Sequence, residues 1–231
     1  MQIVILAGGL GTRMRPYTDK IPKAMLPVND QAFVDYQMAL FKNVGITKVV
    51  FCVGHLGEIL EKHIGTGKRW GIKVLYSWER EKLLGTGGAL KNAGNLLDTT
   101  FLLTWGDSFV RADYKAILNK HIASKFPISV AVFKNQNKWD KSNINYKEGK
   151  IVKYEKNSAS TDLKYIDAGL SVFNRDFLME IPEGIVTLDN IWKSLSLEGR
   201  LGGIEIKDRF YEIGSEKGFK EFIKFARSLE L

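Results

Sequence analysis

Apolar and polar positions alternate along the first part of the chain in a rhythm that predicts strands and helices in turn. Short apolar runs rich in β-branched residues are typical of buried parallel strands, and they occur at 2–6, 48–53, 72–76, 101–105 and 128–133. Apolar residues at helical spacing lie between these runs, at 34–44, 58–63, 86–97 and 114–124. Strands that alternate with helices at this spacing predict an α/β protein with a parallel sheet.

The rhythm changes after residue 133. Short strands without intervening helices are predicted at 143–146, 149–154 and 169–173, with a hairpin turn between the first two. The last part contains helices at 188–197 and 217–229 around a strand at 204–206. We therefore expect an α/β fold with a Rossmann-like, doubly wound, mostly parallel sheet and a small antiparallel element, in three α/β/α layers. No linker interrupts the chain, so one domain over residues 1–231 is expected.

Composition and charge narrow the function classes only slightly. The 231 residues are 45% hydrophobic and 26% charged, which excludes extensive disorder, and no apolar run reaches the roughly 18 residues of a membrane span. The net charge of +8 suits an anionic partner. Its Lys and Arg residues are not clustered and the tryptophans are scattered, so neither nucleic acid nor a membrane is expected. Cys52, the single cysteine, cannot form an internal disulfide, and a reducing, cytoplasmic location is expected.

A glycine-rich loop directly follows the first predicted strand. Gly8, Gly9 and Gly11 let the backbone present N–H groups to an anion, and Arg13 adds a guanidinium suited to phosphate. A Walker A loop would need Gly-Lys-Ser/Thr, and a dinucleotide fingerprint would need a glycine where Met14 stands. Further along, two prolines flank Lys23, which predicts an extended, stiff segment that carries this lysine into a site.

An aspartate marks the end of the fourth predicted strand. Asp107 follows Gly106 at the carboxyl edge of the sheet, where open α/β folds bind ligands. Mg²⁺ takes one or two carboxylates together with phosphate oxygens, so Asp107 is a candidate metal ligand. The alternative is that Asp107 caps a helix that begins at Ser108.

At this point the chain resembles a known family, the nucleoside-triphosphate:sugar-1-phosphate nucleotidyltransferases. The letters LAGGLGTRMRPYT at 6–18 and IPKAMLPV at 21–28 look like the signature of that family. Shorter matches follow in the family's order at 84–89, 106–107, 155–156, 167–170 and 210–214. The chain stops near Leu231 without the β-helix tail of longer members. It is therefore similar to short members such as the heptose-1-phosphate and mannose-1-phosphate guanylyltransferases.

The resemblance implies a reaction in which a nucleoside triphosphate and a sugar 1-phosphate give a nucleotide sugar and pyrophosphate, with Mg²⁺ as cofactor. A phosphate oxygen is the nucleophile, so the enzyme needs no general base. His55, His63 and His121 are accordingly expected at the surface or packed against helices. GTP and a D-glycero-D-manno-heptose or mannose 1-phosphate are favoured, for synthesis of capsule or lipopolysaccharide. UTP, dTTP, CTP or ATP with another sugar 1-phosphate is the alternative.

The resemblance also implies roles for individual residues. Arg13 would hold the β- and γ-phosphates, Lys23 would lie near the α-phosphate, and Asp107 and Glu212 would bind the metal. Glu212 is longer than the family's usual aspartate or asparagine. Residues 1–133 would form a nucleotide-binding half. Its further contacts would be Leu6, Ala7, Gly8, Gly9, Gly11, Thr12, Gly85, Thr86, Gly87, Gly88 and Gly106.

Residues 134–231 would form the half that binds the sugar phosphate. Glu155 and Lys156 resemble the family's Glu-Lys-Pro segment, with Asn157 in place of the proline. Glu155 would bind sugar hydroxyls and Lys156 the phosphate, and Asn143, Asp167 and Gly169 are further candidate contacts. Turn and strand-end roles are the alternative for Asn143 and Asp167.

Three other function classes fit the sequence less well. A nicotinamide-dependent oxidoreductase would need an acidic residue at the end of the second strand, where Val53-Gly54-His55 stands. A non-catalytic nucleotide-binding module would be expected to have lost Arg13, Lys23 or Asp107. A nucleic-acid-binding protein would need clustered basic and aromatic residues. The oligomeric state is left open.

Overall fold

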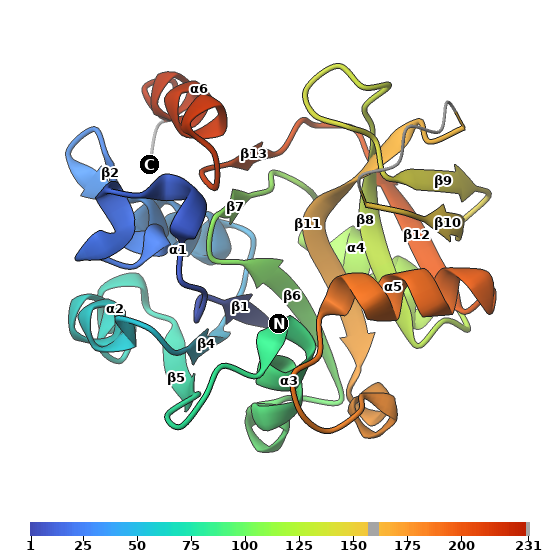
Figure 1. Cartoon of the computed structure of the whole chain (residues 1–231), viewed down its shortest axis with the longest axis horizontal. Coiled ribbons are helices and arrows are strands. Elements are labelled where there is room, and N and C mark those ends of the chain that lie inside the picture. Colours follow the sequence, from blue (N-terminus) through green and yellow to red (C-terminus); the bar gives the residue numbers. More distant parts are fainter. Residues whose placement is uncertain (157–161, 230–231) are drawn as a thin grey trace.

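The computed structural model describes residues 1–156 and 162–229. Within these ranges, one nine-stranded mixed sheet forms the centre of the molecule (Figure 1). In spatial order its strands are β5 (Lys73–Trp78), β4 (Lys48–Val53), β1 (Gln2–Leu6), β6 (Thr100–Trp105), β11 (Tyr165–Asn174), β8 (Ile128–Lys134), β12 (Leu201–Ile206), β10 (Lys150–Tyr154) and β9 (Ile144–Lys147).

The first four strands of this order are parallel and end at one edge. Leu6 is in register with Cys52 of β4 on one side and with Trp105 of β6 on the other. The chain adds β4 and β5 on one side of β1 and then crosses to place β6 on the other. Such a reversal leaves a crevice at the carboxyl ends of the strands, where open α/β sheets bind ligands.

The other end of the sheet is more antiparallel than the sequence predicted. β11 runs antiparallel to both β6 and β8, and β9 pairs with β10 and also with β11, so that this end partly closes on itself. β11 begins at Tyr165, four residues before the predicted strand, and has a register shift between Asp167 and Ser171. The α/β class is confirmed, but the antiparallel part is not a small addition.

Helices cover both faces of the sheet and create two apolar cores. On one face α1 (Phe33–Asn43), α2 (Gly57–Ile64) and α4 (Tyr114–Ile122) bury their apolar residues. On the other face lie α3 (Gly85–Asn92) and α5 (Leu188–Leu197), where Trp192 of α5 packs on Phe173 of β11. The helices predicted from apolar spacing are all present, although α3 ends at Asn92, before the predicted residue 97.

A third apolar cluster, which we call the terminal cluster, joins the beginning of the chain to its last helix. Phe222 of α6 (Glu216–Ala226) packs edge-on to Phe33, at 4.9 Å between ring centroids, and lies 5.1 Å from Phe109. Met14 and Ile213 are buried in the same cluster. Figure 1 shows α6 beside the N-terminal segment. That segment contains the hairpin of β2 (Pro27–Val28) and β3 (Gln31–Ala32), and β7 (Ser108–Phe109) pairs with β13 (Tyr211–Glu212) below α6.

The fold bears on two features considered above, a possible membrane span and the single cysteine. Across the described residues, no helix has the length and apolar character that crossing a bilayer requires. Cys52 is 1% exposed near the end of β4, and burial raises the pKa of its thiol above the ordinary value. A buried thiol of this kind acts as a small apolar core residue.

Candidate active site

Four charged residues predicted from distant parts of the sequence meet at one point. The Nζ atom of Lys23 donates to Oδ2 of Asp107 at 2.8 Å, across 84 positions of sequence. Gly214 lies against the same group. A side chain at Gly214 would place its Cβ 2.8 Å from Oδ2 of Asp107, 3.0 Å from Oε2 of Glu212 and 3.2 Å from a guanidinium nitrogen of Arg13. Two carboxylates and two cations therefore surround one small space.

Asp107 is placed by a tight turn between β6 and β7. The turn is fixed by Ile213, whose N–H donates to the carbonyl oxygen of Asp107 at 2.8 Å. Ser108 begins a strand and not a helix, so the alternative of a helix cap at Asp107 is wrong. The side chain of Asp107 remains about one-fifth exposed, which leaves it open to a ligand.

Glu212 reaches the same space from β13. Its Oε2 accepts from the N–H of Gly214 at 2.6 Å, and its Oε1 accepts from the hydroxyl of Ser215. Ser215 also caps α6 by accepting from the N–H of Gly218. The longer glutamate side chain is thus held at the start of α6, and its carboxylate still lies beside Gly214.

These carboxylates fit a magnesium ion that is shared with phosphates. Among the residues that the structure describes, no three His, Cys, Asp or Glu side chains gather into a complete metal cage. Mg²⁺ does not need one, because it commonly binds one or two carboxylates together with substrate phosphates and water. Asp107 and Glu212 offer two carboxylates at one point, with Arg13 and Lys23 next to them to meet phosphate oxygens.

The glycine loop lies at the carboxyl edge of the parallel strands, as predicted. Ala7 N–H donates to Cys52 O, and Gly106 N–H donates to Leu6 O, both at 2.9 Å, so the loop leaves β1 between the ends of β4 and β6. Lys23 departs from the prediction, because it begins a 3-10 turn, Lys23–Met25, and not an extended segment. The turn fits this lysine because Pro22 precedes it in extended conformation and supplies the carbonyl that Met25 N–H binds.

Glu79 is a residue of this region that the sequence prediction missed. Its Oε2 would lie 2.6 Å from a Cβ at Gly8, and its Oε1 accepts from Leu84 N–H at 2.6 Å. Burial raises the pKa of the Glu79 carboxyl above its ordinary value, and the bond from Leu84 partly offsets that effect. Glu79 lines a cavity of about 450 Å³ with Leu10 and Gly54. The available signal was its position directly after β5, at the same edge as Gly8.

The second glycine segment, residues 85–88, packs against another part of the protein. Gly87 N–H donates to Val186 O at 2.8 Å, and Leu188 N–H donates to the Thr86 hydroxyl at 2.8 Å. A Cβ at Gly88 would lie only 2.7 Å from the carbonyl oxygen of Gly184. Close packing within the protein therefore accounts for glycine here, in addition to any contact with a nucleotide.

A cavity of about 580 Å³ connects this charged cluster to the antiparallel end of the sheet. Residues predicted for the metal, the triphosphate and the sugar phosphate line it together. They are Arg13, Asp107, Asn143, Lys156, Asp167, Gly169 and Glu212. Gly169 lies at the register shift of β11, where a Cβ would come within 2.9 Å of the Ser108 hydroxyl oxygen. Glycine thus lets β11 approach the turn that carries Asp107.

Carboxylates dominate the part of the cavity that lies over β11 and α5. Asp167 accepts from Gly169 N–H at 2.8 Å and from the indole N–H of Trp192 at 3.3 Å. Burial raises the pKa of Asp167 to about 6, and the neighbouring charge of Asp189 adds to the rise. Asp189, another residue the sequence prediction missed, accepts from Lys156 Nζ at 2.7 Å. Nothing in its spacing distinguishes Asp189 from an ordinary residue of the first turn of α5.

The remaining residues predicted to contact the sugar differ in their positions relative to the cavity. Asn143 accepts from Asp167 N–H at 3.0 Å, so it also holds the strand that carries Asp167. Glu155 forms an ion pair with Lys153 at 2.7 Å and is not among the residues that line the cavity. Asn157 lies outside the described residues.

An aromatic clamp around Arg209 closes one side of the cavity. The guanidinium carbon of Arg209 lies 3.6 Å from the centre of the Trp139 ring and 4.7 Å from the ring of Tyr211. Arg209 also forms an ion pair with Glu221 of α6. The loop that carries Trp139 is wrapped around buried Asn135, which donates to the carbonyl oxygen of Asp140 at 2.6 Å.

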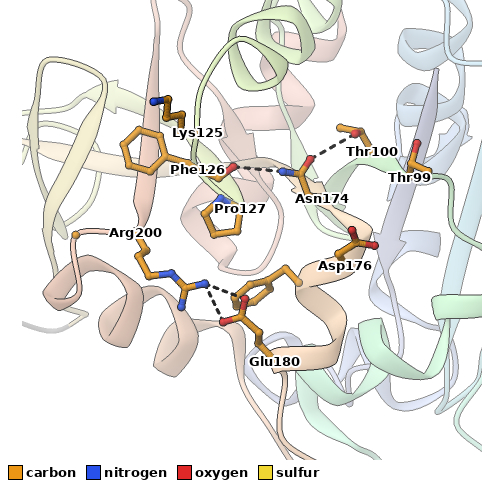
Figure 2. A pocket seen from close by; sticks show the side chains of 11 residues that line it. Thr99, Thr100, Lys125, Phe126, Pro127, Asn174, Asp176, Glu180 and Arg200 are labelled. Atoms are coloured by element: carbon orange, nitrogen blue, oxygen red, sulfur yellow. Dashed lines mark hydrogen bonds and ion pairs between the residues drawn. The ribbon is translucent and has the colours of Figure 1, made fainter.

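A second, larger cavity lies at the opposite edge of the sheet, near the amino ends of β6, β8 and β12. It measures about 760 Å³, and in Figure 2 Arg200 points toward Glu180 across it, with both nitrogen–oxygen distances at 2.8 Å. None of the predicted site residues lines it. His121 is buried nearby, bonded to Ser129 and Asn174, while His63 bonds to Asp35, which agrees with the structural roles expected for histidines.

Comparison with known proteins adds independent findings. The family model described as nucleotidyl transferase matches residues 2–190. A D-glycero-alpha-D-manno-heptose 1-phosphate guanylyltransferase of Campylobacter jejuni is 31% identical over 177 residues, which cover 76% of this chain and 77% of that protein. A UTP–glucose-1-phosphate uridylyltransferase of Synechocystis is 28% identical over 201 residues, or 80% of this chain. The match spans about half of that relative, 52% of its length.

A solved structure shares the fold. HddC from Yersinia pseudotuberculosis, complexed with GMP-PN, superposes with a TM-score of 0.79 at 19% identity. The superposition covers 97% of this chain and 99% of that one. Nearly all of the present chain therefore follows the path of that structure.

Proposed function

The chain belongs to the nucleotidyl transferase family, and we propose that it transfers a nucleotidyl group from a nucleoside triphosphate to a sugar 1-phosphate, releasing pyrophosphate. The observation that carries the proposal is the meeting of Arg13, Lys23, Asp107 and Glu212 around Gly214. This cluster lies where the proposed nucleotide-binding half, residues 1–133, meets the proposed sugar-phosphate half, residues 134–231. A reaction between one ligand in each half would take place there.

The residues act by alignment and by neutralising charge. A phosphate oxygen of the sugar 1-phosphate attacks the α-phosphorus, and the bond from that phosphorus to the pyrophosphate oxygen breaks. The attacking oxygen is already ionised near neutral pH, so no proton has to be removed. Lys23 stabilises charge at the α-phosphate and Arg13 grips the departing pyrophosphate. Lys156 weakens its contact with Asp189 and binds the phosphate of the incoming sugar 1-phosphate.

Asp107 and Glu212 are the residues that would hold Mg²⁺. The ion would neutralise phosphate charge and help to orient the triphosphate. Lys23 holds the Asp107 carboxylate in place, and Gly214 and Ser215 hold that of Glu212. Both carboxylates therefore need little rearrangement when a metal–triphosphate complex arrives.

Guanine is the base that we favour, and Glu79 is the reason. The carboxylate faces the glycine loop, where the Rossmann-like crevice would receive the base and ribose. An ionised carboxylate only accepts hydrogen bonds. Guanine offers two adjacent donors, N1–H and N2–H, whereas uracil and thymine offer one N–H between two carbonyl oxygens. The heptose-specific relative named above is also a guanylyltransferase.

For the sugar we favour D-glycero-D-manno-heptose 1-phosphate or mannose 1-phosphate, used in the cytoplasm for capsule or lipopolysaccharide precursors. The similarity to the Campylobacter jejuni enzyme supports the heptose. The cavity supports a ligand with many hydroxyl groups, because the carboxylates of Asp167 and Asp189 line it and accept hydrogen bonds. Asn143 can add a donor.

The test is an assay of pyrophosphate release, with five triphosphates crossed against several sugar 1-phosphates and Mg²⁺ present. We expect GTP with a manno-configured sugar phosphate to give the highest kcat/KM. A site built around hydrogen bonds can reject an analogue by about 10⁴. Nucleotide binding without pyrophosphate release from any pair would instead support a non-catalytic module.

The base is tested separately with Glu79→Gln. An amide both donates and accepts, so it suits uracil better than guanine, and the preference should move from GTP toward UTP. Glu148→Gln is the control, because Glu148 is an exposed acid at the turn between β9 and β10, outside the cavity that Glu79 lines. Equal GTP preference in wild type and Glu79→Gln would remove Glu79 from base recognition.

A further inference from the structure

A buried glutamine lies directly behind the turn that carries Asp107. Gln37 belongs to α1 and is fully buried. Its side-chain Nε2 donates to the carbonyl oxygen of Trp105 at 3.0 Å and to that of Ser108 at 2.7 Å. These carbonyls stand on either side of Gly106-Asp107, so one amide group ties together both ends of the turn.

The other half of the Gln37 amide has no partner. In the part of the chain that the structure describes, its Oε1 is the one buried side-chain oxygen or nitrogen without a hydrogen bond. A buried acceptor left unpaired costs free energy, so such a group calls for an explanation. Reversing the amide would place Oε1 against two carbonyl oxygens with no hydrogen between them and would lose both bonds. The two bonds to the turn thus fix the orientation of the amide.

The turn is held from the other side as well. Ile213 N–H binds the carbonyl oxygen of Asp107, and Ser108 of β7 is in register with Glu212 of β13. A shift of the turn would therefore move Asp107 and, through the strand pair, Glu212. Gln37 touches neither carboxylate, yet it fixes the backbone turn that carries Asp107 and that leads into the strand paired with Glu212.

We propose that Gln37 is a positioning residue that sets the spacing of the Asp107 and Glu212 carboxylates for a divalent cation. The inference rests on the proposed function, because it assigns these two carboxylates to the metal. A primary amide suits the task, since it supplies two donors from one nitrogen without a charge. Loss of a group that orients metal ligands typically weakens metal binding by about 10–100-fold.

The experiment compares two buried glutamines. Gln2 is also buried, donates to Leu96 O at 2.9 Å and accepts from Asp98 N–H at 2.7 Å, at the opposite edge of the sheet. Gln37→Met and Gln2→Met remove the same chemistry at the two places. The full chain is titrated with Mn²⁺ alone, free Mn²⁺ is followed by electron paramagnetic resonance, and thermal melting is recorded for each variant.

We expect both variants to melt earlier than wild type, and only Gln37→Met to weaken Mn²⁺ binding, by about 10-fold or more. The apparent KM for Mg²⁺ in the pyrophosphate assay should rise in the same variant alone. If Gln37→Met does not fold, Gln37→Asn keeps the amide one methylene shorter, and the same loss of Mn²⁺ affinity is expected.

Equal Mn²⁺ affinity in wild type and the folded Gln37 variant would overturn the inference, as would equal weakening in the Gln2 variant. Failure of wild type itself to bind Mn²⁺ would be a different result. In that case the apparent KM for Mg²⁺ decides, because the triphosphate then supplies further metal ligands. Pyrophosphate release that needs no divalent cation would remove the metal from the proposed function, and the positioning role of Gln37 would fall with it.

Discussion

The parallel and antiparallel ends of the candidate active site are built by different means. At the parallel end, the backbone does much of the work: glycines bring Glu79 close to the first loop, and Lys23 holds Asp107 through one ion pair. At the antiparallel end, side chains contributed by separate elements bond to one another, as in the chain of contacts from Lys156 through Asp189 to Tyr154. The difference teaches that the first end gathers cations beside carboxylates, which under the proposed function would meet phosphate, whereas the second end gathers acceptors that would meet hydroxyl groups.

The sharpest way to break this comparison is to remove a cation from the parallel end. Lys23→Ala and Arg13→Ala should stay folded and lose about 10²–10³ in kcat, the usual cost of one preorganised contact to transition-state charge. Lys48→Ala is the control, because Lys48 pairs with Asp98 at 3.0 Å on the far edge of the sheet. Steady-state kinetics of pyrophosphate release measure the effect. A near-normal rate in Lys23→Ala or Arg13→Ala would exclude that residue from the reaction.

The carboxyl group of Asp167, at the antiparallel end, should make the free energy of unfolding depend on pH. The pKa of Asp167 is about 6 in the folded protein, raised mainly by burial, and its ordinary value is 3.8. Well below its ordinary pKa of 3.8, at about pH 2–3, the group is protonated in both states and has no effect on stability. Between about pH 3 and 6 it ionises mainly in the unfolded chain, so stability falls as pH rises. Above pH 6 the full cost, about 3 kcal/mol, is present.

Asp167→Asn removes this titration. Relative to Asp167→Asn, wild type should lose about 3 kcal/mol of unfolding free energy between pH 3 and pH 7. Urea denaturation at several pH values gives the difference, in which the titrations of other carboxyls cancel. A difference that stays constant over this range would show that Asp167 titrates normally.

The glycines of the parallel end can be divided by substitution into those that pack and those that do not. Gly88→Ala should destabilise the protein by about 1–3 kcal/mol, because its Cβ would collide with Gly184 O. Gly94→Ala is the control, since its Cβ would meet only a methyl of Leu178 at 3.4 Å. Thermal melting distinguishes them. Equal melting of the two variants would mean that the 184–186 segment moves aside.

The smallest effect on stability is expected at the exposed ion pair between Lys156 and Asp189, at the antiparallel end. Lys156→Ala should change the unfolding free energy by less than about 1 kcal/mol, because its partner Asp189 is partly exposed. It should nevertheless raise the KM for the sugar 1-phosphate. Lys153→Ala, which breaks a similar pair with Glu155 outside the cavity, should leave that KM unchanged. A shared change of KM would point to a general effect of charge.

Most of the fold could be predicted from the sequence because local patterns determine it. β1, β4 and α5 begin and end at the predicted residues. The early start of β11 was missed because a register shift between Asp167 and Ser171 separates its first residues from the apolar run that follows. The expected extension around Lys23 was wrong because proline restricts only its own and the preceding residue, and the 3-10 turn begins just after Pro22.

The sequence proposed which residues belong to the site, but it did not predict how their side chains contact one another. The sequence proposed Lys23, Asp107 and Glu212 as neighbours of one ligand, but their mutual positions depend on pairing between distant strands. Gln37 carried an unused signal, since it is a polar residue inside the apolar stripe from Val34 to Phe41 on α1. Asp189 gave no signal, because an acid in the first turn of a helix is ordinary.

The terminal cluster affects the order in which parts of the protein can fold during synthesis. Arg13 is among the first residues to leave the ribosome, while Glu212 is held at the start of α6, whose Phe222 seals the cluster against Phe33 and Phe109. The parallel strands β1, β4, β5 and β6 all end by Trp105, so they can form early in synthesis. The second carboxylate can join the charged cluster only after Glu212 and α6, near the end of the chain, have been made.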